Sequence, residues 1–175
     1  MVAVEVVRVF TDPDGRYGNP LGVVADGASI ADPADRQALA ARLGYSETIF
    51  IDDFEQSSIQ IFTPAVELPF AGHPTVGAAW VLARELGCHP ECILTAGGQI
   101  RTWSDGGVVW IRGPLASTPP WWHERLDTAG VVEALSGPLS PEQDAPQVWA
   151  WQDEQAGVAG TADVGGWVSS DGPLH

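Results

Sequence analysis

The sequence predicts an α+β protein, and three observations lead to that fold class. Short runs rich in β-branched and aromatic residues recur between turn-forming segments. The segment 74–86 (PTVGAAWVLAREL) is apolar almost all round, which favours a helix covered by other structure on most sides. The chain has 175 residues, enough for one domain or for two very small ones. A buried helix among many strands is typical of the α+β class.

The N-terminal segment predicts two strands, 2–10 and 21–25, joined by the turn-rich TDPDGRYGNP. The run Asp12-Pro13-Asp14-Gly15 begins like a calcium-binding loop, but Val23 stands where such a loop has its twelfth-position Glu. We therefore interpret this run as a turn and not as a calcium site.

A short one-sided helix follows, with Asp32 as its cap and Pro33 at its first position. Gly44 suits the left-handed residue after its last turn. Two β-rich runs come next, 48–51 and 58–62, separated by an acidic loop. Helix and strands thus alternate before the second, more apolar helix.

The helix 74–86 has Pro74 at its predicted first position and Gly87 at its end. Directly after it, Cys88, His89 and Cys92 lie within five residues and raise the question of a metal site. Metal sites usually need four ligands, and no second ligand pair follows at a suitable spacing. A helix-to-strand turn is the favoured interpretation, so no metal is expected.

The later part of the chain contains one clear hairpin, with strands 99–103 and 108–112. From residue 114 onward the sequence is rich in Pro and Trp, and it predicts a helix after Asp127 and two final strands in 147–157 and 163–172. Seven of the eight Trp residues stand at or after position 103. Trp is enriched at protein interfaces, so this half is expected to contain one.

Charge excludes several function classes. The chain has 23 acidic and 8 basic residues, for a net charge of −15, which disfavours nucleic acid and anionic membrane surfaces as partners. All eight basic residues are Arg and none is Lys. A mechanism in which a Lys amine of this chain reacts with the substrate is therefore excluded. No apolar run approaches the ~20 residues of a membrane helix, and the start of the chain alternates like a strand. A cytoplasmic protein is expected.

Two short segments carry candidate chemistry. Gly72-His73-Pro74 stands at the start of the apolar helix, where unpaired backbone N–H groups favour a substrate carboxylate. Gly72 would allow close approach of the backbone to a ligand. The structural alternative is that His73 is only a helix N-terminal residue whose ring is satisfied by its neighbours.

The second segment is Tyr45-Ser46-Glu47-Thr48, at the entry to a strand. A carboxylate that is partly shielded from water has its pKa raised toward neutrality and can act as a general base. The alternative is an exposed surface Glu. A serine hydrolase built on Ser46 is disfavoured because the segment lacks the Gly-x-Ser-x-Gly pattern.

The order of segments VF…YGNPLGVV, LGYSETIFI and FTPAVELPFAGHPTVGAAWVL resembles the phenazine biosynthesis-like (PhzF-like) family of isomerases and epimerases. The resemblance covers residues 4 to about 114. It implies a diaminopimelate epimerase-like domain, in which a curled, mostly antiparallel sheet surrounds one central helix. It also implies proton transfer at a carbon of a small carboxylate-bearing substrate, with no metal and no organic cofactor.

Site residues follow from the same resemblance. Glu47 would be the catalytic acid/base residue, and Gly72 and His73 would bind substrate. Ser46 and Asn19 would line the site.

The family's second domain is only partly matched. We expect residues 1–118 to form the N-terminal domain and 119–175 a remnant of the second, without its acidic loop and central helix. Two chains could then pair as a homodimer and share one cleft, with Trp121 and Trp122 at the interface. The alternative is a catalytically impaired homologue that acts as a binding or interaction protein.

Overall fold

The computed structural model describes residues 2–113, 122–134, 146–149, 151–153, 158–159 and 165–174. It divides into two compact units, Met1–Gly113 with Val164–His175, and Pro114–Asp163. Among the described residues, no helix is long and apolar enough to span a membrane.

The first unit is built on a nine-stranded sheet in the order β3-β2-β1-β13-β8-β7-β6-β4-β5. β3 also pairs with β4, so the sheet curls until it closes on itself. The pairs β2–β3 and β4–β6 are parallel and the other pairs are antiparallel. The strands are β1 (Val4–Thr11), β2 (Tyr17–Val24), β3 (Thr48–Asp53), β4 (Ser58–Phe62), β5 (Glu67–Leu68), β6 (Cys92–Thr95), β7 (Gly98–Asp105), β8 (Val108–Arg112) and β13 (Gly165–Leu174).

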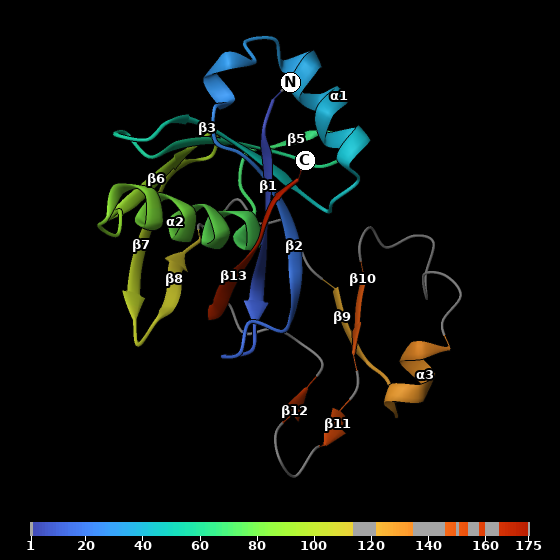
Figure 1. The fold of residues 1–175 in the computed structure, drawn as a ribbon. Coiled ribbons are helices and arrows are strands. Elements are labelled where there is room, and N and C mark those ends of the chain that lie inside the picture. The colour runs from blue at the N-terminus through green and yellow to red at the C-terminus, as the bar shows by residue number, and fades with distance from the viewer. Residues whose placement is uncertain are drawn as a thin grey trace. The chain divides into compact units, whose positions relative to one another are not determined.

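Helix α2 (Gly72–Leu86) occupies the interior of this sheet and contacts β1, β2, β3, β8 and β13 (Figure 1). Val76, Ala79 and Leu82 are wholly buried against the strands. A side chain at Gly77 would collide with Leu21 and would lie 2.9 Å from Val9 Cγ2, so glycine allows the helix to approach β1 and β2 closely. The predicted class, a curled mostly antiparallel sheet around one central helix, is confirmed.

Helix α2 begins two residues earlier than predicted, at Gly72 instead of Pro74. Proline is tolerated in the first turn because the backbone N–H groups there have no partner within the helix. His73 is therefore a helical residue, and its side chain projects from the first turn. The apolar helix was otherwise located correctly, including its end at Gly87, which adopts a φ of 71°.

Helix α1 (Pro33–Leu43) lies on the other side of β3 and β4 and covers a second core with Phe50 and Phe62. It has the predicted ends: Asp32 accepts a hydrogen bond from Ala34 N at 2.9 Å, and Gly44 has a φ of 71°. Its termination leads the chain directly into Ser46, Glu47 and β3.

Arg36 connects α1 to the sheet through an ion pair and hydrogen bonds. Its side chain is 7% exposed and makes a 2.7 Å ion pair with Asp52 on β3. The same guanidinium donates hydrogen bonds to Gln60 Oε1 on β4 and to the carbonyl oxygens of Ile30 and Gly27, the last in the short helix η1 (Gly27–Ser29). Four acceptors thus satisfy one buried cation.

The second unit contains β9 (Trp122–Arg125), α3 (Ala129–Glu133), β10 (Pro146–Trp149), β11 (Trp151–Asp153) and β12 (Val158–Ala159). β9 pairs with β10 in parallel, and β11 pairs with β12 antiparallel. The helix predicted after Asp127 is confirmed, with Thr128 capping it. Trp121, predicted at an interface, lies outside the described residues, and Trp122 is described only by its backbone.

Candidate functional site

Glu47 and His73 lie side by side although 26 residues separate them. His73 Nδ1 is 2.9 Å from Glu47 Oε2, and the two side chains are 11% and 19% exposed, respectively. Gly22 N donates to Glu47 O at 3.3 Å, which sets the start of β3 beside β2. The buried helix α2 brings its first turn to the same place. The structure therefore brings the two sequence segments with candidate chemistry into contact.

The second ring nitrogen of His73 faces β2. Nε2 lies 3.2 Å from the backbone oxygen of Asn19. Both ring nitrogens thus face oxygen acceptors, a carboxylate and a carbonyl. A neutral imidazole can donate to only one of them, whereas the doubly protonated ring donates to both.

Ser46 and Gly72 complete the set of residues singled out from the sequence. Ser46 Oγ lies 3.5 Å from Asn19 Oδ1. Asn19 also contacts His73 through its carbonyl oxygen, and Ser46 donates a hydrogen bond to Glu47, so both residues adjoin the Glu47–His73 pair. A Cβ atom at Gly72 would meet no atom within 4 Å, which means that the backbone there borders open space. The helix cap is Ala71, which has no side-chain acceptor for the first N–H groups. An anion could approach this end of the helix.

The expected direction of the Glu47 pKa was wrong. Burial raises the pKa of this carboxyl. The hydrogen bonds from His73 and Ser46 and the charge of His73 together lower it by more than burial raises it, so the pKa lies below its ordinary value of 4.5. Shielding from water had suggested a value near neutrality. The partners that reverse the shift include a residue from another element, which the local sequence does not reveal.

One further side chain borders His73 that sequence reasoning missed. The Phe10 ring lies 6.1 Å from the His73 ring, centroid to centroid, at an interplanar angle of 45°. Phe10 belongs to β1 and has a φ of 66°, in the left-handed region. The alternating pattern of this strand gives no sign of such a conformation.

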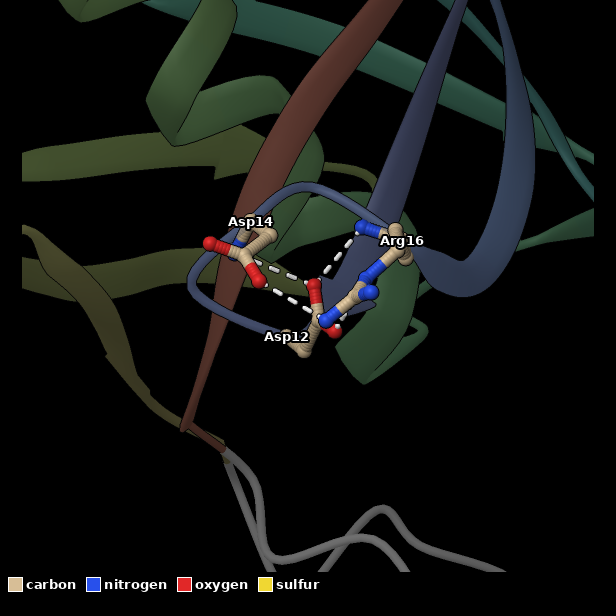
Figure 2. A network of polar contacts seen from close by, with 3 residues as sticks. All are labelled: Asp12, Asp14 and Arg16. Atoms are coloured by element: carbon tan, nitrogen blue, oxygen red, sulfur yellow. Dashed lines mark hydrogen bonds and ion pairs between the residues drawn. The ribbon is translucent and has the colours of Figure 1, made fainter.

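The two motifs interpreted as turns are turns in the structure. Cys88 and His89 lie between the end of α2 and β6, which begins at Cys92. In the β1–β2 turn, the Arg16 guanidinium lies 3.0 Å from Asp12 and 2.7 Å from Asp14 (Figure 2). Arg16 thus pairs with the two carboxylates that a calcium ion in this loop would need as ligands. Within the described ranges, no group of three or more His, Cys, Asp and Glu side chains could hold a metal ion.

Comparison with known protein families identifies the family to which this chain belongs. The family model of phenazine biosynthesis-like proteins matches residues 7–102, more than half of the chain. The chain belongs to this family. The matched range contains Asn19, Ser46, Glu47 and the whole of α2, so every candidate site residue lies within the family's pattern.

Individual family members match over part of their length. An uncharacterized isomerase from Pasteurella multocida is 40% identical over 115 residues, which are 61% of this chain and 38% of that protein. The trans-2,3-dihydro-3-hydroxyanthranilate isomerase of Pseudomonas fluorescens is 38% identical over 86 residues, 47% of this chain and 31% of that enzyme. This chain therefore matches less than two fifths of the length of either relative.

The fold comparison agrees. The crystal structure of a PhzF-family phenazine biosynthesis protein from Bacillus anthracis superposes with a TM-score of 0.51 at 29% identity, over 63% of this chain and 39% of that one. The closed sheet with α2 inside is thus the family's domain architecture.

Proposed function

We propose that this chain is a cofactor-independent isomerase or epimerase that moves a proton at a carbon atom of a small carboxylate-bearing metabolite. The contact between Glu47 and His73 at the start of α2 carries the proposal. It places a carboxylate that can exchange a proton beside donors that can bind an anion. Membership of a family that includes an isomerase of trans-2,3-dihydro-3-hydroxyanthranilate supports the same reaction class.

The proposed step starts from ionised Glu47, which the lowered pKa favours at neutral pH. The carboxylate takes a proton from a substrate carbon, and a second group returns one to a different carbon or to the opposite face of the same carbon. His73 and the first N–H groups of α2 stabilise the negative charge that develops meanwhile. A substrate that excludes water from Glu47 raises the pKa of its carboxyl, because desolvation acts in that direction.

The site needs a second wall, and we propose that a second copy of the chain provides it. Among the described residues, no other carboxylate forms a hydrogen bond or ion pair with Glu47 or His73. A group that returns the proton could therefore come from a partner chain arranged about a two-fold axis. Sedimentation equilibrium at micromolar concentration tests the pairing, and a single species of 18.5 kDa would refute it.

Solvent deuterium exchange tests the reaction. The first substrate to try is trans-2,3-dihydro-3-hydroxyanthranilate, followed by a panel of small carboxylates. Wild-type protein should move deuterium from D₂O into a carbon position, and Glu47→Gln should abolish this exchange. The control is Glu55→Gln, which makes the same change at an exposed position after β3. Equal exchange by wild type and Glu47→Gln would rule out the assigned role.

A binding protein without turnover is the second candidate. The lowered pKa of Glu47 favours it, because a carboxylate that is stabilised in its ionised form is a weaker base. Calorimetric binding of a carboxylate ligand without any deuterium exchange would identify this function. Loss of that binding in His73→Gln would assign it to the same site.

A further inference from the structure

Three groups surround the His73 ring, and two of them come from one hairpin. Glu47 meets Nδ1 from the start of β3. The β1–β2 hairpin supplies both the Asn19 carbonyl at Nε2 and the Phe10 ring. The orientation of the imidazole therefore depends on how this hairpin is shaped.

Phe10 has an unusual backbone. Its φ of 66° is unfavourable for a bulky residue, because the left-handed region brings Cβ close to the following carbonyl group. The residue coincides with a β-bulge: Val9 pairs with Val168 and Thr11 with Trp167, so β1 has one residue more than β13 at this point. Non-glycine residues in this region persist where surrounding structure imposes them, often at functional sites.

The bulge changes the direction of the Phe10 side chain. In a regular strand, neighbouring residues point to opposite faces, so Phe10 would point away from the face of Val9. Instead, Phe10 packs against the inner core that contains the wholly buried Val9, and its ring reaches His73 at the entry to α2. Bulges beside active sites characteristically redirect a side chain in this way.

Hydrogen bonds within the turn also hold the tip of the hairpin (Figure 2). Asp12 accepts hydrogen bonds from Asp14 N at 3.0 Å and from Arg16 N at 2.8 Å, and Asp12 N donates to Arg16 O at 3.0 Å. These contacts fix the turn that connects Phe10 to Asn19. The Phe10 ring and the Asn19 carbonyl, which both contact His73, therefore belong to one hairpin whose turn is held by hydrogen bonds.

We propose that Phe10 is a positioning residue, whose ring holds the His73 imidazole in the orientation that serves Glu47 and the Asn19 carbonyl together. The catalytic part of this proposal rests on the proposed function. Its structural part concerns the ring of His73 alone, and can be tested without a substrate.

The test compares Phe10→Leu with Phe54→Leu. Phe54 is also partly buried against the inner core, but the structure shows no ring contact between it and His73, so the control makes the same chemical change elsewhere in that core. Protein with ¹⁵N-labelled histidine reports the ring nitrogens by NMR, and His73→Gln assigns the His73 signals. We expect Phe10→Leu to shift both His73 nitrogen signals and to increase ring motion. Phe54→Leu and the ring-preserving Phe10→Tyr should leave the signals in place.

Unchanged His73 signals in a folded Phe10→Leu protein would overturn the proposal. If Phe10→Leu does not fold, Phe10→Tyr and Phe10→Trp replace it, and the signals must then remain near their wild-type positions. With an active wild-type enzyme, Phe10→Leu should lower kcat by about tenfold or more with little change in KM, because a small misplacement of a reacting group is costly. Absence of wild-type turnover would contradict the proposed function but would leave the NMR result decisive for positioning.

Discussion

His73 Nδ1 lies 2.9 Å from Glu47 Oε2, and this contact joins the first turn of the buried helix to the start of β3. The same contact lowers the pKa of Glu47 against the opposing effect of burial. Its removal should therefore have consequences for ionisation that can be measured without knowing the substrate.

Replacement of His73 by Gln should raise the pKa of Glu47. The desolvation that raises this pKa remains, while the charge of the ring and its hydrogen bond are lost. NMR titration of the side-chain carboxyl carbons measures the change, with Glu47→Gln assigning the signal. A pKa that stays at its wild-type value in His73→Gln would show that Ser46 alone accounts for the shift.

Acid should remove a stabilising contribution of Glu47. Because the folded-state pKa lies below the ordinary value of 4.5, ionised Glu47 stabilises the fold above that pH, and the contribution is lost as pH falls through the folded-state pKa. Urea unfolding of wild type should therefore lose free energy below pH 4.5 more steeply than that of Glu47→Gln. Glu55→Gln serves as the control and should follow wild type. Parallel curves for wild type and Glu47→Gln would contradict the pKa shift.

Gly72→Ala should separate ligand binding from stability. No atom lies within 4 Å of the added Cβ, so the free energy of unfolding should change by less than about 1 kcal/mol. The methyl group nevertheless occupies the open space beside the helix start, and KM or ligand Kd should rise. Gly44→Ala also meets open space but has a φ of 71°, and should destabilise the protein by about 1–2 kcal/mol. Unimpaired binding by Gly72→Ala would place the ligand elsewhere.

Gly77→Ala should destabilise the domain although alanine favours helix formation. The new methyl group would collide with Leu21 and lie 2.9 Å from Val9 Cγ2, so the helix must move away from β1 and β2. We expect a loss of about 2 kcal/mol in urea unfolding. An increase in stability, as in a typical exposed helix, would mean that α2 is not packed this closely.

Arg36→Met should destabilise the attachment of α1 by about 3 kcal/mol, because it leaves buried acceptors and Asp52 without their partner. Arg42→Met on the same helix is the matched control, since Arg42 is exposed, and it should change stability by less than about 0.5 kcal/mol. Chemical denaturation of both variants measures the difference. Equal effects would show that the network around Arg36 contributes little.

Local patterns predicted the elements that have strong local signals. The caps of α1, the apolar composition of α2, the β-rich run of β4 and the hairpin that contains β8 led to the correct type and nearly correct bounds. The two-residue β5 and the four-residue β6 were not predicted, because segments this short show no periodicity. Sequence therefore located the core of the domain well and its minor strands poorly.

Features that depend on distant partners were beyond local patterns. The direction of the Glu47 pKa depends on a ring 26 residues away, and the bulge at Phe10 depends on pairing with β13 at the far end of the chain. The family resemblance identified Glu47, His73, Gly72, Ser46 and Asn19 together, whereas the geometry among them required the fold. Their catalytic and binding roles remain predictions.

The place of β13 between β1 and β8 has a consequence for synthesis on the ribosome. Val4 pairs with Leu174, so β1 acquires one of its neighbours only after the intervening residues have been made and β13 has emerged. Until then a nascent chain exposes two open sheet edges, at β1 and at β8, which can pair with other chains. Folding of this domain therefore waits for β13, and chaperone protection of those edges until then should affect the yield of native protein more than the stability of the finished fold.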